Sequence, residues 1–376
     1  MRFSDVIGQT YPKQLLRQMA TGSRLPHALL FLGPAGSGKK ALALALAQYV
    51  LCENPGTEDA CGLCNACRKV DKLLHPDLHF SFPSIGTNAT SEIFLPQWRS
   101  AIAENPYFDV NHWLQLIGAD NKQGNITKEE CLNIIRKLSL KTFEGEYKIL
   151  IMWLPEYLGK EGNRLLKMIE EPPDQTLFFL LAENQELILP TILSRCQLVK
   201  VNTLHDEEVV EGLVRREVAG QREAESVAYL SNGNFFEACK LAADHQNDYA
   251  TKLLDWLRKA YGGNGVELVR WSEEIAGIGR EKQKQFLRYA LHFMREYMAL
   301  LVTGNAQVRL QPEELQTAQK LTTVIAFDQI TLIAQLFDDC SYHVERNANP
   351  KVLFLDASIQ MHHIIKRKIA ALSPAS

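Results

Sequence analysis

The segment "HALLFLGPAGSGKKALALALAQYVL" (His27–Leu51) decides the fold of this chain. It begins with a short apolar run typical of a buried strand, and it ends with a stretch of helical composition and length. Between them, glycines allow backbone N–H groups to point inward at phosphate oxygens, and the start of the following helix adds a favourable dipole. The segment therefore predicts a phosphate-binding loop (P-loop) between a strand and a helix.

The P-loop motif is incomplete at its last position. "GPAGSGKK" (Gly33–Lys40) fits G-x-x-x-x-G-K-[ST] up to Lys39, whose ammonium is expected to reach the terminal phosphates. The final residue of the motif normally places a hydroxyl on Mg²⁺, but Lys40 has none. The loop is thus degenerate, and the sequence leaves its occupancy by ATP or ADP open. The residues predicted to contact a nucleotide are Gly33, Gly36, Gly38 and Lys39.

The strand that should carry the acidic residues of a nucleotide-hydrolysing site lacks them. Such a strand ends in an Asp that helps to hold the metal and, in many ATPases, a Glu that orients the attacking water. In "YKILIMWLPE" these positions hold Trp153 and Leu154. Glu156 follows two residues later, and because Pro155 fixes the backbone between them, we do not expect Glu156 to return to the site. We predict no cleavage by this chain alone.

The first two hundred residues alternate strands and helices. Further strands are predicted at "LHFSFP", Trp113–Gly118, "YKILIMW" and Thr176–Ala182, and a helix opened by a capping box of Thr127 and Glu130 is predicted at "TKEECLNIIRKLSL". Continuous apolar strands in a β-α-β-α order predict an α/β fold with a parallel sheet covered by helices. The polar and aromatic stretch Ser84–Asn111 has no clear period and is interpreted as a variable excursion.

From Asp206 onward the strand signals vanish. "DEEVVEGLVRREVA", "EAESVAYLS" and "FFEACKLAADH" predict three short helices, and Arg280–Gly304 keeps the i, i+3, i+4 apolar spacing of a longer one. We therefore predict three domains: a P-loop α/β domain (1–203), a small helical lid (204–246) and an all-α C-terminal domain (247–376).

Four of the eight cysteines are clustered as C-x8-C-x2-C-x2-C, at Cys52, Cys61, Cys64 and Cys67. In a reducing compartment such spacing favours one tetrahedral zinc over disulfides, and four thiolates close the coordination sphere, so the zinc is predicted to be structural. The alternative is reduced thiols without a metal. His75 and His79 are not needed as ligands. The cysteines predicted to be single core residues are Cys131, Cys196, Cys239 and Cys340.

The composition limits what the chain can be expected to bind and where it is expected to be located. The net charge of −3 gives no global drive toward nucleic acid or anionic membranes. The apolar run Ala41–Cys52 is too short for a membrane helix, and the first ten residues lack the apolar core of a signal peptide. We therefore expect a cytoplasmic protein without membrane contact. The zinc knuckle (52–67) carries several acidic residues, which favours a brace over a nucleic-acid-binding module.

The chain resembles bacterial clamp-loader subunits of the AAA+ class in the DNA polymerase III complex, and most closely the delta-prime type. "VIGQ", "RLPHALLFLGPAGSGK", the position of the cysteine knuckle, "HPDLH", "LSLKTFEGEYKI", "NRLLKMIEEPP" and "LPTILSRCQ" carry the resemblance. It runs from about Met1 to about Ala243 and returns weakly at "NANPKVLFLDASIQMHHII". It implies a zinc-binding insertion, a lid, and a helical collar that mediates oligomerisation.

The resemblance also implies roles for single residues. The arginine of the family's Ser-Arg-Cys motif, Arg195 here, is an arginine finger that acts on a neighbour's ATP site; the alternative is a surface salt bridge. The family's sensor-2 arginine is replaced by Phe236, while Asn184, beside Glu183, falls near sensor 1. Three basic side chains either face DNA or lie in solvent: Lys160, Arg164 and Lys167.

These residues favour one function over two others. The resemblance implies a catalytically silent subunit of the polymerase holoenzyme that works with gamma/tau-like motor and delta subunits, the sliding clamp and primed DNA. An active gamma/tau-like motor ATPase would need a complete P-loop, an acidic strand end and the sensor-2 arginine. A P-loop nucleotide kinase would need a lid rich in arginine.

Overall fold

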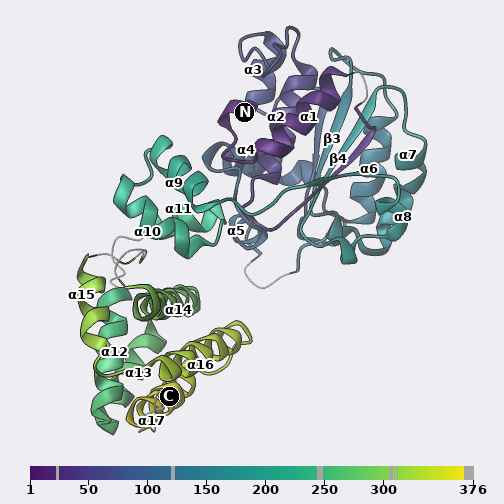
Figure 1. Cartoon of the computed structure of the whole chain (residues 1–376). Helices are drawn as coiled ribbons and strands as arrows, with labels where there is room; N and C mark the ends of the chain where they lie inside the picture. Colours follow the sequence, from purple (N-terminus) through teal and green to yellow (C-terminus); the bar gives the residue numbers. More distant parts are fainter. Residues whose placement is uncertain are drawn as a thin grey trace. The chain divides into compact units, whose positions relative to one another are not determined.

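The computed structural model describes residues 1–22, 25–119, 123–243, 249–304, 308, 310 and 312–367. The chain forms two compact units, residues 1–243 and residues 244–376 (Figure 1). The predicted boundary between an α/β domain and a lid at residue 203 stays a prediction. The predicted boundary at residue 246 lies outside the described residues.

A five-stranded sheet in the order β2-β3-β4-β1-β5 forms the centre of the first unit. Every paired strand runs parallel to its neighbour, as the continuous apolar runs predicted. The P-loop follows β1, which lies between β5 and β4, and β3 is the next strand beyond β4. The strands are β1 (Ala28–Leu32), β2 (Leu78–Ser81), β3 (Lys148–Trp153), β4 (Thr176–Ala182) and β5 (Gln197–Lys200).

Helices cover both faces of the sheet (Figure 1). On one side lie α1 (Thr10–Thr21), α2 (Lys39–Leu51), α3 (Asn65–Asp71), α4 (Leu95–Glu104) and α5 (Val110–Leu116). On the other lie α6 (Lys128–Leu138), η3 (Pro155–Arg164), α7 (Leu166–Glu170) and α8 (Pro190–Leu193). Short 3₁₀ turns complete the unit at η1 (Phe3–Asp5), η2 (Ser91–Phe94) and η4 (Gln185–Leu187).

The pleat of the strands divides the core into two layers. Phe31 and Ile151 pack toward α2, whereas Leu30 and Leu150 pack toward α6. Successive strand residues point to opposite faces, so apolar residues at every position bury both sides of the sheet. This explains why β3 and β4 are buried along their whole length.

The strand predicted at Trp113–Gly118 is wrong, because these residues lie in and just after helix α5. The Asp109 carboxylate accepts the His112 N–H at 2.7 Å and caps the start of this helix. Trp113 is fully buried, but Leu116 is exposed. A short apolar run suits a strand or a helix equally well, and here the cap at Asp109 selects the helix.

The stretch Ser84–Asn111 is also more ordered than its lack of period suggested. It forms η2 and α4 and sends Trp98 and Phe108 into the core beside α2. The Trp98 ring is stacked on Phe82, with the ring centroids 4.3 Å apart. The excursion is therefore part of the hydrophobic core.

The capping box predicted at the start of α6 is half formed. Thr127 Oγ1 accepts the Glu130 N–H at 3.1 Å, as predicted. The Glu130 carboxylate, however, accepts the N–H of Ser91 at 2.9 Å instead of returning to Thr127. Glu130 thereby ties the excursion to α6.

The three helices predicted after Asp206 are confirmed as α9 (Asp206–Arg215), α10 (Gln221–Ser231) and α11 (Phe235–Ala243). Their apolar faces, which include Leu213 and Phe235, join the same buried cluster as α2. The lid is thus packed against the P-loop side of the first unit.

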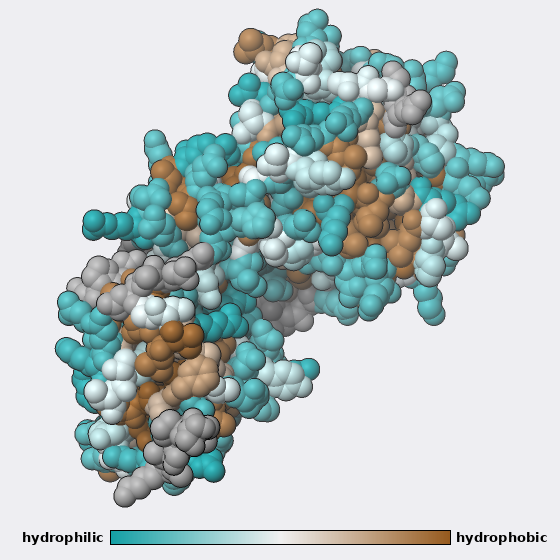
Figure 2. All heavy atoms as spheres, in the orientation of Figure 1, coloured by the Kyte–Doolittle hydropathy of each residue, from teal (hydrophilic) through white to brown (hydrophobic). Residues whose placement is uncertain are grey.

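The regular elements of the second unit are all helices over the residues that the structure describes, as predicted. Trp256 is stacked on Trp271 with the ring centroids 4.5 Å apart, and on Phe337 at 5.1 Å. The unit exposes apolar side chains such as Val266 and Val352, and Figure 2 shows apolar residues gathered on its visible face. Its helices are α12 (Tyr249–Gly262), α13 (Gly265–Gly277), α14 (Arg280–Thr303), α15 (Pro312–Leu321), α16 (Phe327–Glu345) and α17 (Pro350–Lys366).

Among the helices of the described residues, none has the length and apolarity needed to span a membrane.

Candidate functional site

The structure brings the four predicted cysteine ligands together. Their Sγ atoms all lie within 4.8 Å of one another. The Sγ atoms of Cys61 and Cys67 are 3.9 Å apart, close to the separation of about 3.8 Å that a tetrahedral site with Zn–S bonds of about 2.3 Å requires. In the part of the chain that the structure describes, this is the one group of His, Cys, Asp or Glu side chains placed to share a metal ion.

Backbone N–H groups point at the sulfur atoms of this cluster. Cys61 Sγ accepts N–H groups from Leu63 at 3.5 Å and from Cys64 at 3.3 Å. These two bonds lower the pKa of the Cys61 thiol to about 6. Burial acts in the opposite direction on Cys67 and raises its pKa. The loop therefore presents sulfur atoms in the arrangement that a metal ion with thiolate ligands needs.

The cysteine knuckle is tied to the rest of the first unit. The Asp59 carboxylate accepts the N–H groups of Phe3 at 3.0 Å and of Ser4 at 2.9 Å. The Tyr49 hydroxyl on α2 donates to the Gly56 carbonyl at 2.8 Å. The knuckle thus links the N-terminal segment to the P-loop helix, which is the geometry of a brace.

In the P-loop, Lys39 is turned toward the loop itself. Its Nζ donates to the carbonyls of Gly33 at 2.6 Å and Pro34 at 2.7 Å. It lies 3.6 Å from the Glu183 carboxylate at the end of β4. Burial lowers the pKa of Lys39, against the charges of Glu183 and Glu156, which raise it. The Lys39 ammonium, which is expected to contact the terminal phosphates, is thus held by the Gly33 and Pro34 carbonyls and the Glu183 carboxylate.

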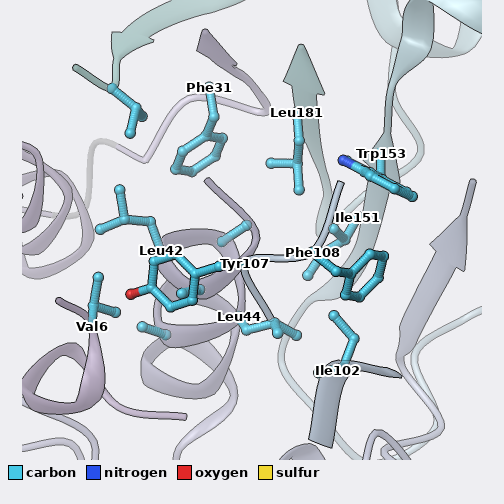
Figure 3. Close-up of a cluster of buried hydrophobic side chains, with 14 of the residues drawn as sticks. Val6, Phe31, Leu42, Leu44, Ile102, Tyr107, Phe108, Ile151, Trp153 and Leu181 are labelled. Carbon is cyan, nitrogen blue, oxygen red and sulfur yellow. The ribbon is translucent and has the colours of Figure 1, made fainter. Parts of the chain in front are cut away.

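Lys40 lies where the metal-binding hydroxyl of an intact P-loop would be attached. Its Nζ is 3.8 Å from the ring centroid of Phe108 and 4.0 Å from that of Trp153, and it donates to the Phe108 carbonyl. The side chain is buried, and this desolvation holds the pKa of Lys40 well below its ordinary value. Figure 3 shows Phe108 and Trp153 beside each other. Lys40 and Trp153, which stand at two positions where an intact site would carry metal ligands, are therefore in contact with each other and with the Phe108 ring.

The end of β3 turns away from the sheet at Leu154, which has a φ of 57°. Glu156 then accepts the N–H groups of Glu183 at 2.5 Å and Asn184 at 2.8 Å. Burial raises the pKa of Glu156, and its charge acts on Lys39. The Glu156 carboxylate therefore lies at the end of β4, where its charge reaches Lys39, and the expectation that it stays out of the site remains a prediction. Asn184, the sensor-1 candidate, caps η4.

At the lid, Phe236 packs beside His112 and Lys240. Its ring is 5.0 Å from the His112 ring, and Lys240 Nζ lies 4.4 Å from its centroid. Phe236 is buried. The sensor-2 position therefore packs against α5 and offers no guanidinium to a phosphate.

Two residues of the site were missed by the sequence analysis. Tyr107 and Phe108 come from the excursion, and both are buried beside the P-loop helix (Figure 3). A signal was present, because a stretch containing Trp98, Tyr107, Phe108 and Trp113 is too aromatic for a solvated loop. Nothing in the sequence indicated that these rings would be directed at the P-loop.

Arg195 follows α8 and is half-buried. Its Nη2 is 2.8 Å from the Glu170 carboxylate, and its Nη1 donates to the Thr191 carbonyl at 2.8 Å. Glu170 ends helix α7. The chain thus gives Arg195 a salt bridge, which the alternative interpretation predicted, at a surface position from which a guanidinium can also be offered to a neighbour.

A parallel sheet in this order, with a P-loop after β1 and a helical lid packed beside it, defines an AAA+ P-loop protein. The chain belongs to the family described as "DNA polymerase III, delta subunit", whose model matches residues 8–205, more than half of the chain.

Curated relatives carry related names. The chain is 27% identical over 233 residues to DNA polymerase III subunit delta' of Bacillus subtilis, covering 62% of this chain and 59% of that protein. It is 30% identical over 189 residues to the delta' subunit of Pseudomonas aeruginosa, covering 50% of this chain and 47% of that one. Tau of Escherichia coli is 26% identical over 208 residues, covering 55% of this chain and 26% of tau. The chain thus spans less than two thirds of these relatives.

Proposed function

We propose that this chain is a delta-prime-type subunit of a clamp loader, silent as an ATPase, that supplies Arg195 to the nucleotide site of a neighbouring subunit. Its partners are gamma/tau-like motor subunits, a delta subunit, the sliding clamp and, through the complex, primed DNA. The family match and the delta' relatives support the class of complex. The apolar residues exposed on the helical second unit suit subunit contacts.

The contents of the P-loop carry the proposal of silence. A hydrolytic site needs a metal ion, ligands for it and a group that orients the attacking water. Here Lys40 packs against Trp153 where those ligands belong, and Phe236 replaces the sensor-2 arginine. Because the metal ligands and the sensor-2 arginine are replaced together, restoring one of them is not expected to restore turnover.

Arg195 is the residue proposed to act on a partner. Arginine suits this role because its planar guanidinium can form paired hydrogen bonds to phosphate oxygens. The contacts with Glu170 and Thr191 hold it at the surface beside α7 and α8. The basic residues Lys160 and Arg164 are exposed on η3; Arg164 pairs with Glu161, and we assign no DNA contact to them.

The cysteine cluster is proposed to hold one structural zinc ion. Cys52, Cys61, Cys64 and Cys67 supply four sulfur ligands, so no position remains for a reactive water. The contacts of Asp59 and Tyr49 make the knuckle a brace for the N-terminal segment and α2.

The rival function is an active motor, and gamma and tau proteins are among the relatives. A phosphate-release assay on the purified chain, with ATP, Mg²⁺ and primed DNA, distinguishes the two. We expect no turnover above the blank from the natural chain or from Lys40→Thr, because Trp153 and Leu154 still supply no metal ligand. Turnover in the ordinary ATPase range, stimulated by DNA, would instead identify a motor.

A further inference from the structure

The excursion places Tyr107 against the P-loop. The Tyr107 side chain is 1% exposed, and its hydroxyl accepts the Ile7 N–H at 2.9 Å. A Cβ built on Gly38 would lie 3.0 Å from the edge of the ring. Figure 3 shows Tyr107 between Leu42 of α2 and Val6 of the N-terminal segment. One ring therefore contacts the last glycine of the P-loop and the segment that precedes α1.

The same ring also contacts the lid. Tyr107 and Phe235 have their ring centroids 5.0 Å apart. The guanidinium carbon of Arg216 lies 5.1 Å from each of these two centroids. Tyr107 thus joins three parts of the first unit that are far apart in the sequence: the N-terminal segment, the P-loop and the lid.

The lid closes directly over the loop. A Cβ built on Gly36 would lie 1.8 Å from Asn234 Oδ1, and the Phe235 N–H donates to the Gly36 carbonyl at 3.2 Å. Gly36, Ser37 and Gly38 are buried by these contacts. In a P-loop that accepts phosphate, the N–H groups of such residues face the ligand. Here side chains of the protein cover the same residues.

The segment that carries Tyr107 is anchored at both ends. The Asn105 side chain accepts the Tyr107 N–H at 3.1 Å, and Asp109 caps α5. Phe108 accepts from Lys40 through its carbonyl and packs edge-on against Trp153, with ring centroids 5.2 Å apart. The backbone of the segment is therefore held in place on the P-loop side of the core.

We propose that residues 105–109 act as an internal occupant of the P-loop site, with Tyr107 as the link between the P-loop and the lid that a nucleotide would otherwise form. This inference rests on the proposed function, since it assigns a cause and a consequence to the silent site. The cause is occupancy: Tyr107 fills the space beside Gly38, and the lid, which Tyr107 holds through Phe235, places Asn234 beside Gly36. The consequence is that the lid stays closed on the α/β layer whether or not nucleotide is present.

Burial alone does not distinguish Tyr107 from an ordinary core aromatic. Three contacts together do: the hydroxyl is bonded to the backbone of Ile7, the ring lies on Gly38, and it pairs with the Phe235 ring. A matched control is available in Phe80. It is buried in the same cluster and packs on Trp98, but it comes from β2.

The test uses the full chain and amide hydrogen exchange of α9–α11. We expect Tyr107→Ala to speed exchange in the lid by about tenfold or more, whereas Phe80→Ala, which removes a ring of similar size, leaves lid exchange near that of the natural chain. Tyr107→Phe keeps the ring and should speed exchange mainly at the Ile7 amide. Equal effects of the two alanine variants on the lid would overturn the proposal. If Tyr107→Ala does not fold, two other measurements test the proposal: the hydrogen exchange of the Ile7 amide in Tyr107→Phe and the nucleotide titration.

In the nucleotide titration, ADP is added with and without Mg²⁺, and binding is measured by calorimetry. The natural chain is expected to show no binding at about millimolar ADP, and Tyr107→Gly with Lys40→Thr is expected to bind ADP measurably. Binding by the natural chain, or no binding by the double variant when it is folded, contradicts occupancy by residues 105–109. A different result would contradict the proposed function: a reconstituted complex that loads clamps equally well without this chain.

Discussion

In the sequence, the cysteine knuckle and the P-loop are equally clear motifs. In the structure, they differ in what contacts their ligand-binding groups. In the knuckle, the Sγ atoms of Cys61 and Cys67 are 3.9 Å apart, and all four Sγ atoms lie within 4.8 Å of one another, as a shared metal ion requires. In the P-loop, Lys39 is bonded to Gly33 and Pro34, and Tyr107 covers Gly38. Both motifs keep their backbone geometry. Only in the P-loop do other side chains of the protein contact the residues that would bind the ligand.

The difference shows that a motif predicts the path of a backbone more securely than the presence of a ligand. Four cysteines carry both the shape and the chemistry of their site, because their own side chains are the ligands. A P-loop binds phosphate with N–H groups, and neighbouring segments decide whether those groups face a cavity or a side chain. Four predictions sharpen this contrast.

The knuckle should depend on its metal for stability. We expect one zinc ion per chain, and we expect Cys67→Ser to lose it. A loss of about 3–5 kcal/mol in stability would lower Tm by about 6–20 °C, because each kcal/mol shifts Tm by about 2–4 °C in a unit of this size. Elemental analysis and thermal unfolding measure both. Cys131→Ser, at a buried cysteine outside the cluster, is the control and should keep the zinc. Less than about half an equivalent of zinc in chain purified without chelator would remove the metal site from the comparison.

If the P-loop is silent, the chemistry of this chain is concentrated at Arg195. An arginine finger is worth about 10³–10⁵ in rate at the site that depends on it. In a reconstituted loader, Arg195→Ala should reduce total ATP hydrolysis modestly, because other motor sites continue, and should reduce clamp loading much further. Arg195→Lys should rescue poorly, because lysine lacks the planar fork.

Glu170→Gln separates the two interpretations of Arg195. It breaks the salt bridge and keeps the arginine, at a cost of about 0–1 kcal/mol in stability. A finger predicts that Glu170→Gln still loads clamps, whereas a purely structural salt bridge predicts that it behaves like Arg195→Ala. Glu171→Gln is the neighbouring control. Loading at the natural rate by Arg195→Ala would leave Arg195 as a surface salt bridge.

The buried lysine of the P-loop should make stability depend on pH. The pKa of Lys40 is lowered by folding, so the unfolded chain binds more protons between the folded pKa and about 10.4. The contribution of Lys40 to the free energy of unfolding therefore rises with pH through that window and is lost as pH falls. Lys40→Met should stabilise the chain by about 1–3 kcal/mol at neutral pH, and the gain should shrink toward pH 10.

Denaturant titrations of the natural chain and Lys40→Met at pH 7 and pH 9.5 measure this dependence. Lys128→Met, at an exposed lysine that begins α6, is the control and should show no comparable change between the two pH values. A gain that is equal at both pH values would mean that the charge of Lys40 is not what costs stability.

Much of the fold could be predicted, and the failures have identifiable causes. The strands β1, β3 and β4 and the lid helices were found because buried apolar runs and amphipathic periods are local patterns. The segment Trp113–Gly118 was mistaken for a strand because the cap at Asp109 was not weighed. Glu130 was expected to close its own helix, but it bonds to the N–H of Ser91, 39 residues away in the sequence.

By itself the sequence determined the P-loop backbone, the cysteine ligand set and the absence of acidic residues at Trp153 and Leu154, because each is a matter of residue type at a short spacing. Only the tertiary structure decided what fills the P-loop. Tyr107 and Phe108 reach it from a stretch without helical or strand period, and Asn234 reaches it from the lid. Which residues pack together depends on the shape of the whole core. The types and spacing of neighbouring residues do not determine contacts between segments that are far apart in the sequence.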